Sequence, residues 1–336
     1  MTGPGVEAAM RLAVDQAQRV KGSTYPNPPV GAVILDAAGD VVGTGGTEPV
    51  GGPHAEVIAL HAAGERAAGG TAVITLEPCN HHGRTPPCVD ALLAAGVAAV
   101  VFAVADPNPA AAGGAERLRA AGVTVTGGVC ADEVAGGPLR EWLHKQRTGL
   151  PHVTWKFATS VDGRSAAADG SSQWITGEAA RADVHRRRAA ADAIVVGTGT
   201  VFADNPTLTA RLPGGSLAEH QPLRVVVGHR EIAPEANVLN DDSRTMVIST
   251  HDPDEVLRAL SDRTDILIEG GPTLAGAFLR AGAIDRILAY VGPILLGGPI
   301  MAVDDVGVPT IARALRWSYD GVERIGPDLL LSLVPG

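Results

Sequence analysis

Residues 71–88 read TAVITLEPCNHHGRTPPC, and this stretch joins a structural pattern to a chemical one. Residues 71–76 form an apolar run of the length of a buried strand, and residues 89–95, just after the stretch, have helical spacing. Cys79 follows the predicted strand, and Cys88 stands at the start of the predicted helix. The stretch therefore predicts an α/β arrangement with two thiols at the junctions between its elements.

The alternation of strands and helices continues along both halves of the chain, which predicts an α/β fold. In the first half, we expect helices at residues 7–20, 54–64, 89–95, 114–121 and 139–146, and strands at 30–35, 41–45, 71–76, 97–104 and 123–126. In the second half, we expect helices at residues 179–190, 254–260 and 274–281, and strands at 152–158, 193–196, 223–227, 246–249, 265–268 and 286–291.

Length and a break in this pattern both indicate two domains. At roughly 150 residues per domain, a chain of 336 residues suggests two. Gly149 and Pro151 end the helix predicted at 139–146, and the next strand begins at once. We therefore place the domains at residues 1–147 and 148–336.

Charge and composition disfavour several classes of protein. The net charge of -10 opposes general binding to nucleic acids or anionic membranes, so we expect neither partner. The longest apolar stretch, residues 91–105, is too short to span a bilayer. Charged residues in the N-terminal segment leave it without the apolar core of a signal peptide. Three cysteines are too few for a disulfide framework. These features predict a cytoplasmic location.

Three residues of the first half have the chemistry of a zinc site. His54, Cys79 and Cys88 supply one imidazole and two thiolates, which leave a fourth zinc position for water. Zinc lowers the pKa of such a water, and Glu56, beside His54, suits the catalytic transfer of its proton. The alternative is two buried cysteines and a surface histidine, but their order and placement favour the metal. The remaining cysteine, Cys130, has no nearby partner and fits a small buried residue.

The order His-x-Glu, then Pro-Cys and a second Cys, is the signature of zinc-dependent nucleobase deaminases. Residues 75–88, with eight residues between the cysteines, closely resemble the deaminase motif of the RibD/RibG family of bifunctional riboflavin-biosynthesis deaminase/reductases. PNPPVGAV (residues 26–33) and ADPNP (residues 105–109) resemble the same family. The resemblance implies a cytidine-deaminase-like, three-layer α/β/α domain with one Zn²⁺, which removes an amino group from a phosphoribosylated diaminopyrimidinone by hydrolysis.

The resemblance also assigns substrate contacts in this domain. It implies that Asn27 hydrogen-bonds the pyrimidine and that His82 and Arg84 hold the ribose phosphate. From the residues alone, Asn27 is equally a turn residue between prolines, and His82 and Arg84 are equally solvated loop residues.

In the second half, two glycine turns follow predicted strands and precede helix starts. They are Gly197-Thr198-Gly199-Thr200 and residues 270–276, GGPTLAG. Backbone N–H groups and the helix dipole make such a turn a site for a phosphate, although many similar turns are only tight connections.

Four segments resemble the reductase half of the same family: ATSVDGR (158–164), SQWIT (172–176), TVFADNPTLT (200–209) and EGGPT (269–273). The resemblance implies a dihydrofolate-reductase-like α/β domain that uses NADPH. By position, the cofactor is expected at Ala158, Trp174, Thr200, Asp204, His229, Gly271, Pro272, Thr273, Leu274, Ala275, Gly276 and Ala277. The substrate is expected at Lys156, Ser172, Arg188, Leu208, Arg211 and Glu269.

Some of these positions keep simpler alternatives. Trp174 also fits a core residue, and Arg188 a solvated helix face. His229 stands where many relatives have a small polar residue; it or Arg230 could meet the 2′-phosphate of NADPH.

Taken over nearly the whole chain, the resemblance predicts a two-step enzyme. The first half deaminates the small phosphorylated pyrimidine, and the second reduces its ribosyl group to a ribityl chain; the family also implies a homo-oligomer, a dimer through the reductase domain. A nucleic-acid-editing deaminase is disfavoured by the net charge and by the lack of a basic, aromatic strip. A non-catalytic zinc protein is disfavoured by Glu56.

Overall fold

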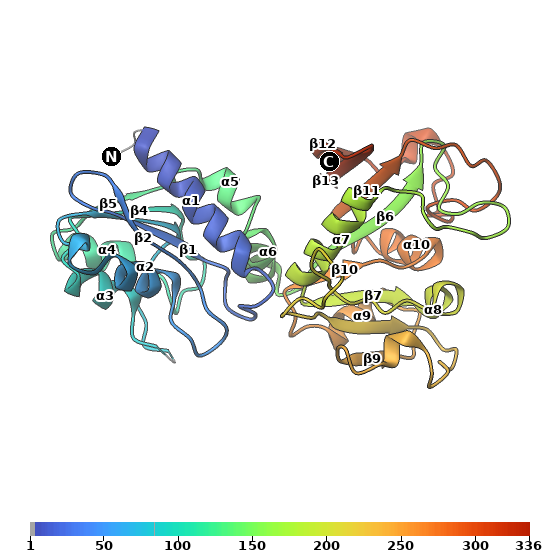
Figure 1. Cartoon of the computed structure of the whole chain (residues 1–336), viewed down its shortest axis with the longest axis horizontal. Coiled ribbons are helices and arrows are strands. Elements are labelled where there is room, and N and C mark those ends of the chain that lie inside the picture. The colour runs from blue at the N-terminus through green and yellow to red at the C-terminus, as the bar shows by residue number, and fades with distance from the viewer. Residues whose placement is uncertain (1–3, 84) are drawn as a thin grey trace. The chain divides into compact units, whose positions relative to one another are not determined.

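The computed structural model describes residues 4–83 and 85–336, and it divides the chain into two compact units, Met1–Gly149 and Leu150–Gly336 (Figure 1). The first unit closes with helix α6 (Arg140–Thr148). Gly149 ends this helix in the left-handed conformation, with φ of 74°, and its N–H donates to the Lys145 carbonyl at 2.8 Å. The helix thus runs one residue past the boundary that we place after residue 147. Each unit has its own sheet.

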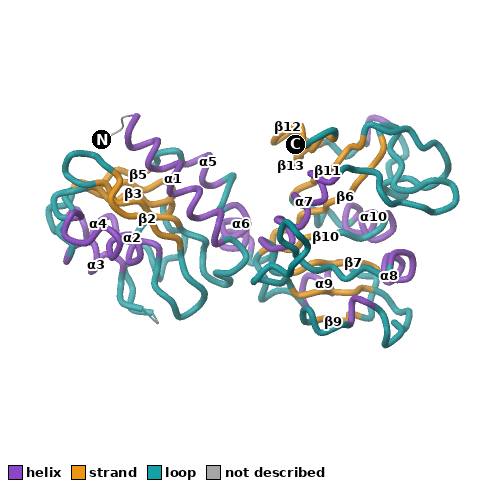
Figure 2. Tube along the Cα trace, in the orientation of Figure 1, coloured by secondary structure: helices purple, strands orange, loops and turns teal. Residues whose placement is uncertain are grey.

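The first unit is built on a five-stranded sheet (Figure 2). From edge to edge, its strands are β2 (Val41–Gly46), β1 (Gly31–Leu35), β3 (Thr71–Leu76), β4 (Ala99–Val104) and β5 (Thr124–Gly127). β1 is antiparallel to both neighbours, whereas β3, β4 and β5 are parallel. The carboxyl ends of these three strands therefore lie along the same end of the sheet. The other helical segments are α1 (Pro4–Val20), α2 (Ala55–Ala63), η1 (Gly64–Ala67), α3 (Cys88–Ala94), α4 (Gly114–Ala120) and α5 (Ala131–Ala135).

Glycines of the β1–β2 hairpin let helices approach both faces of this sheet. A Cβ atom on Gly31 would lie 1.9 Å from the carbonyl oxygen of Ala13 in α1. A Cβ atom on Gly43 would lie 2.1 Å from the carbonyl oxygen of Ala59 in α2. Ala32, the neighbour of Gly31, pairs with Gly45, so Gly43 and Gly45 lie on the face opposite to Gly31, and α1 and α2 cover opposite faces of the sheet. The three-layer α/β/α prediction is confirmed.

The second unit contains an eight-stranded sheet. Its order is β12 (Trp317–Ile325), β13 (Asp328–Pro335), β11 (Arg286–Gly292), β6 (His152–Ser160), β10 (Asp265–Ile268), β7 (Ala193–Gly197), β8 (Leu223–Val227) and β9 (Thr245–Ile248). The six strands from β11 to β9 are parallel, and β12 and β13 add an antiparallel hairpin at one edge. This mixed sheet agrees with the predicted α/β reductase class.

Helices again lie on both faces. α9 (Pro253–Ala259) and α10 (Pro272–Arg280) pack against the face that carries Trp155 and Ile287, whereas α7 (Glu178–Ala190) packs against Leu288 and Tyr290 on the opposite face. The remaining helical segments are α8 (Thr198–Asp204), η2 (Asn237–Leu239) and η3 (Ile311–Arg313). Within the described ranges, no helix combines the length and apolar character that crossing a membrane requires.

The helices and strands expected from the sequence all have counterparts in the structure, with ends shifted by at most three residues. Seven further elements of the described residues are not predicted: the helices α5 and α8, the short helical segments η1, η2 and η3, and the strands β12 and β13. β12 is mostly exposed, so its side chains do not alternate between apolar and polar in the way that marks a half-buried strand. α8 contains Thr and Gly, and its helical form follows from its packing on the sheet rather than from its intrinsic propensity.

The glycine contacts generate a prediction about stability. Gly31→Ala places a methyl group against the α1 backbone, and overpacking of this kind costs about 1–3 kcal/mol. We expect calorimetry to show a melting temperature about 3–10 °C lower for the first unit. Gly5→Ala is the matched control, because a Cβ there meets nothing within 4 Å. Equal melting temperatures for the two variants would contradict the close approach of α1.

Candidate functional site

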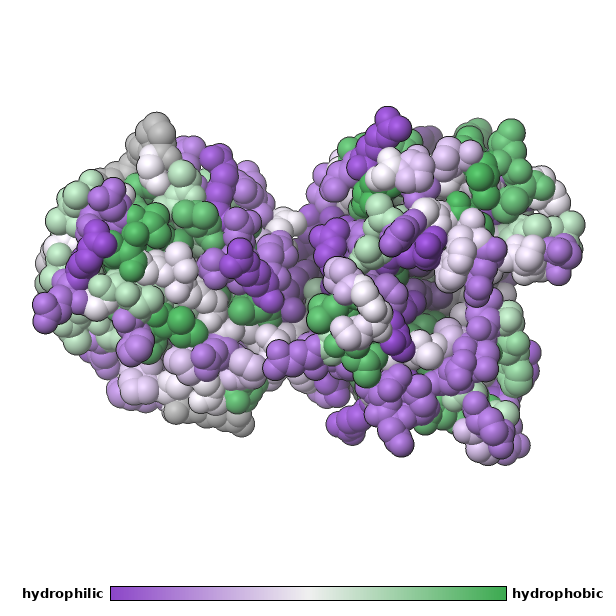
Figure 3. Space-filling model, in the orientation of Figure 1, coloured by the Kyte–Doolittle hydropathy of each residue, from purple (hydrophilic) through white to green (hydrophobic). Residues whose placement is uncertain are grey.

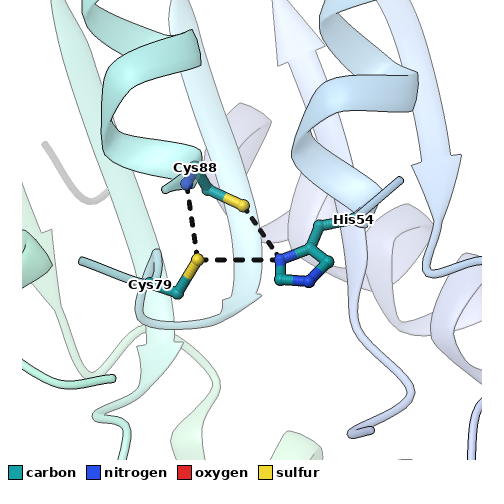
Figure 4. Close-up of side chains that lie close together, drawn as sticks. All are labelled: His54, Cys79 and Cys88. Carbon is teal, nitrogen blue, oxygen red and sulfur yellow. Dashed lines mark hydrogen bonds between the residues drawn. The ribbon is translucent and has the colours of Figure 1, made fainter. Parts of the chain in front are cut away.

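His54, Cys79 and Cys88 come together from three separate elements (Figure 4). His54 precedes α2, Cys79 follows β3, and Cys88 is the first residue of α3. The His54 Nδ1 atom lies 3.2 Å from Cys88 Sγ and 3.6 Å from Cys79 Sγ, and the Cys88 N–H donates to Cys79 Sγ at 3.3 Å. All three ligand atoms lie within 4.8 Å of one another.

The chemistry of these donors fits a zinc ion. Both cysteines are buried, and a hydrogen bond from the Cys88 thiol lowers the pKa of Cys79 to about 4. The same hydrogen bond raises the pKa of Cys88, so the two sulfurs share one proton that a dication would displace. On the far side of the ring, His54 Nε2 lies 3.4 Å from Thr85 Oγ1, a contact that orients the imidazole.

Glu56 lies beside this cluster in the first turn of α2. Its side chain is buried, it lines the same cavity as His54 and Cys79, and burial raises its pKa. A carboxyl group in such surroundings is suited to taking up and releasing a proton.

The cluster opens into a cavity of about 390 Å³ within the first unit. Asn27, the expected pyrimidine contact, lines this cavity. His82 is exposed and is not among the lining residues; His81 lines the cavity instead, and its buried Nδ1 has no hydrogen-bond partner among the described residues. Arg84 lies outside the described residues. The HHGR sequence alone did not indicate which histidine points inward.

Glu77 anchors the loop that contains Asp106 and Asn108, on another side of the cavity. Its carboxylate accepts hydrogen bonds from the N–H groups of Ala115, at 2.9 Å, and Asp106, at 3.4 Å. Asp106 and Asn108 of this loop line the cavity. Sequence reasoning missed all three residues as parts of the site, although ADPNP and the Glu before Pro-Cys were visible signals.

In the second unit, three of the expected substrate residues form a buried ion cluster. Arg188 Nε and Nη2 donate to the Glu269 carboxylate at 2.7 and 2.9 Å, and Lys156 Nζ lies 3.5 Å from it. Although burial opposes it, Arg188 and Lys156 lower the pKa of Glu269 to about 2. Burial lowers the pKa of Lys156. The cluster thus holds a fixed carboxylate and two cations in a region shielded from water.

The two glycine turns of this unit are joined to each other. Thr200, in α8, accepts a hydrogen bond at Oγ1 from the N–H of Gly271, at 3.1 Å. Gly271 caps α10, and Pro272 occupies the first turn of that helix, where its missing N–H costs nothing. The N–H groups of Thr273 and Leu274, in the first turn of α10, therefore remain available next to α8, which suits the binding of a cofactor phosphate.

The remaining expected residues lie around these two features. Ala158 pairs with Tyr290 in the sheet; Trp174 is exposed, with the Arg181 guanidinium 4.5 Å above its ring; and His229 Nδ1 lies 2.9 Å from Ser249 Oγ. Leu208 is buried. Among the described residues, no hydrogen bond or ion pair joins Ser172, Trp174, Asp204, Arg211 or His229 to the Glu269 cluster.

Apolar surface accompanies the carboxyl ends of β6 and β11. Figure 3 shows hydrophobic residues gathered over the loops that follow these strands, and Val161, Leu295 and Met301 of the loops are exposed. Ligands of α/β sheets bind at the carboxyl ends of the strands, and apolar surface there suits the flat face of a ring.

The ion cluster generates a prediction about acid stability. Because the pKa of Glu269 is lowered from 4.5 to about 2, its stabilising effect is complete above pH 4.5 and is lost as the pH falls toward 2. Glu269→Gln leaves two buried cations unopposed, so we expect a loss of about 3 kcal/mol or more for this unit at neutral pH.

The measurement is the melting temperature of this unit as a function of pH. Glu269→Gln should flatten the fall between pH 4.5 and 2, whereas Glu235→Gln, at an exposed loop position, should leave it unchanged. If the melting temperature of Glu269→Gln fell between pH 4.5 and 2 as much as that of the unchanged protein, the stabilising role of the ion cluster would be refuted.

Comparisons with known proteins agree with this geometry. The family model of the cytidine and deoxycytidylate deaminase zinc-binding region matches residues 5–104, and that of the RibD C-terminal domain matches residues 151–331. Riboflavin biosynthesis protein RibD of Mycobacterium tuberculosis is 72% identical over 98% of this chain and 97% of its own length. The Escherichia coli RibD is 39% identical over 98% of this chain and 99% of its own.

Solved structures give the same result. Acinetobacter baumannii RibD superimposes with a TM-score of 0.87, at 39% identity and with 99% of each chain covered. A diaminohydroxyphosphoribosylaminopyrimidine deaminase/5-amino-6-(5-phosphoribosylamino)uracil reductase from Thermotoga maritima superimposes with a TM-score of 0.88, at 31% identity and with 99% of each chain covered. The chain belongs to the RibD family, bifunctional enzymes of riboflavin biosynthesis with a zinc-binding deaminase domain and an NADPH-dependent reductase domain.

Proposed function

We propose that this chain acts twice on one small molecule, a pyrimidine that carries a ribose phosphate. The first step replaces an amino group of the diaminopyrimidinone by a carbonyl oxygen and releases ammonia. The second step reduces the ribosyl group of the deaminated product to a ribityl chain. The observation that carries the proposal is the His54, Cys79 and Cys88 cluster beside buried Glu56, in a chain that also contains the reductase unit.

In the first step, the residues of the chain bind the ring and move protons. Zinc, when bound by His54, Cys79 and Cys88, supplies a Lewis acid that makes water reactive near neutral pH. Asn27 hydrogen-bonds the pyrimidine, and His81 extends the polar lining beyond Glu56. Glu56 takes a proton from the attacking water and delivers it to the departing amino nitrogen, so one water is consumed for each ammonia released.

In the second step, the buried ion cluster orients the sugar. NADPH, when bound along residues 271–277 and Thr200, supplies the hydride. Opening of the ribose ring leaves an oxygen that needs a proton. We assign its donation to Lys156, an ammonium whose side chain is 17% exposed and whose pKa is lowered by burial. Glu269 holds Lys156 and Arg188 in place, and Arg188 and Arg211 supply positive charge for the phosphate.

The division of labour follows the two units. We assign deamination to residues 1–147 and reduction to residues 148–336, and we place the enzyme in the cytoplasm. The support for this division is the separate sheet and the separate polar cluster of each unit.

Two substitutions separate metal binding from proton transfer. Cys88→Ser removes a ligand, so zinc content and ammonia release should both fall, while NADPH oxidation with supplied deaminated intermediate continues. Glu56→Gln keeps the ligands, so zinc content should be unchanged while deamination falls by about 10²–10⁴-fold. Elemental analysis, ammonia assay and NADPH absorbance provide the readouts.

The outcomes of this pair are sharply different. Full zinc and full deamination in Cys88→Ser would refute the site. Zinc loss in Glu56→Gln would make Glu56 a ligand rather than a proton carrier. Failure of the unchanged protein to oxidise NADPH with the deaminated intermediate would refute the second step.

We also propose that two copies of the chain associate through the second unit. Cross-strand pairing places Tyr319 opposite Leu333 and Val322 opposite Leu331, on the sheet face that α10 covers farther along at Ile287. Tyr319 and Val322 are 68% and 58% exposed. An exposed apolar sheet face of this kind is typical of the interface of a permanent homodimer. When two copies pair through the same face, neither face remains free for a third copy, so the assembly stops at a dimer.

Val322→Glu tests this face in the full chain. A carboxylate at the centre of an apolar contact should convert the dimer to the monomer in analytical ultracentrifugation at low micromolar concentration. Glu323→Ala, which changes the neighbouring side chain on the opposite face, should leave the dimer intact. A monomeric unchanged protein, or a dimeric Val322→Glu, would overturn the proposed interface.

A further inference from the structure

A short strap, residues 205–211, connects α8 to the chain before β8 in the second unit. It belongs to no strand, yet Leu208, Thr209 and Ala210 are 2%, 0% and 0% exposed. Leu208 adopts a positive φ of 54°. Buried backbone outside regular structure needs hydrogen-bond partners from side chains, and the proposed function makes this strap part of the substrate site.

Side chains of several elements supply those partners. Thr209 O accepts from Arg188 Nη1 at 3.1 Å, which ties the strap to the Glu269 cluster. Gln221 bonds both the N–H and the carbonyl of Ala210, at 2.9 and 2.8 Å. Thr207 O accepts from Arg224 Nη1 at 3.2 Å. The strap is therefore held largely by side chains, and backbone pairing is confined to its end, where the Ala218 N–H donates to the Ala210 carbonyl at 3.0 Å and Arg211 bridges to Leu217.

Arg224 is the unusual member of this group. It stands on β8, it is 0% exposed, and it forms no ion pair among the described residues. Besides Thr207 O, its guanidinium donates to Asn240 Oδ1 at 2.7 Å, to Asn240 O at 2.5 Å and to Ser243 O. A buried charge is costly unless it is hydrogen-bonded or paired. Here the bonds from Nη1 and Nη2 and the attraction of the nearby Asp242 carboxylate offset part of that cost, whereas Nε has no hydrogen-bond partner among the described residues.

The acceptors Asn240 and Ser243 connect Arg224 to Arg211, one of the expected substrate residues. Asn240 and Ser243 flank Asp242, and the Asp242 carboxylate lies 3.8 Å from Arg211 Nη2. Asn240 Nδ2 also donates to Asp242 at 3.1 Å. Arg224 thus fixes Thr207, next to Leu208, and the turn that holds the partner of Arg211.

We propose that Arg224 is a positioning residue of the reductase, which sets the placement of Leu208 and Arg211 for the phosphorylated substrate without touching it. The proposal rests on the proposed function of the second unit. The planar guanidinium of Arg224 donates to several carbonyls at once, which the ammonium of a lysine at this position would not do. Loss of this geometry should weaken substrate binding more than the chemical step or cofactor binding.

The test uses full-length, zinc-loaded protein with Arg224→Lys. We expect the KM for the deaminated intermediate to rise about tenfold or more, as for the loss of hydrogen bonds from a charged donor. The value of kcat and the Kd for NADPH, from fluorescence titration, should change less than about threefold. Zinc content and ammonia release should match the unchanged protein, because they report on the other unit.

Two further variants keep the test decisive if Arg224→Lys folds poorly. Asn240→Ala, at an exposed position, removes one acceptor of Arg224 and the support of Asp242, and should raise the same KM about threefold. Arg244→Lys is the matched control, since this exposed arginine precedes β9 and contacts Arg224 only through its backbone carbonyl.

The outcomes separate positioning from mere stability. A raised KM in Arg224→Lys or Asn240→Ala, with the control unchanged, supports the proposal. An unchanged KM in the folded variants, or an equal loss of kcat and NADPH affinity, overturns it. If the proposed function itself were wrong, the protein without any substitution would fail to oxidise NADPH with the deaminated intermediate, which distinguishes the two cases.

Discussion

The close packing of α2 on the β1–β2 hairpin is the contact on which the deaminase site depends. Because Gly43 and Gly45 carry no side chain, the backbone of α2 rests directly on the strands. That helix brings His54 at its start and Glu56 in its first turn, whereas Cys79 is fixed by the end of β3. A helix moved outward by the width of a methyl group would separate the imidazole from the two sulfurs. The spacing of the three proposed zinc ligands is therefore set by glycines that lie outside the cluster.

Both units place their chemistry where strands end and helices begin. In the first unit, Cys79 follows β3 and Cys88 opens α3; in the second, Glu269 follows β10 and Gly271 caps α10. The shared reason is that parallel strands end together, while the helix starts beside them carry unpaired N–H groups. The two sites differ in what fills this position. Soft thiols suit a cation in the first unit, and buried arginine and lysine suit a phosphorylated sugar in the second.

Residues that carry chemistry in a fixed order could be predicted from the sequence, whereas residues placed by three-dimensional packing could not. His54, Cys79 and Cys88 sit at predicted element junctions, in the order and with the residue types of a zinc site, so the sequence indicated that they belong together. His81 and His82 are adjacent in a loop without periodicity, and only the folded loop decides which of them lines the cavity. Strand β12 escaped prediction for a related reason: an exposed edge strand lacks the alternation that burial imposes, whereas β13, paired on both sides, does alternate in burial.

In each unit, a buried charged side chain satisfies the backbone groups of a loop beside the proposed site: Glu77 in the first unit and Arg224 in the second. Each site is lined by a loop outside the sheet, and the backbone of such a loop must be satisfied from within the protein. Glu77 accepts from the N–H groups of Asp106 and Ala115, because a helix start exposes donors. Arg224 donates to carbonyls of Thr207, Asn240 and Ser243, because the strap and the turn expose acceptors. The sign of the anchoring charge follows from which backbone groups the loop leaves unpaired. Through Glu77 after β3 and Arg224 on β8, the loops beside the proposed sites are tied to the sheets.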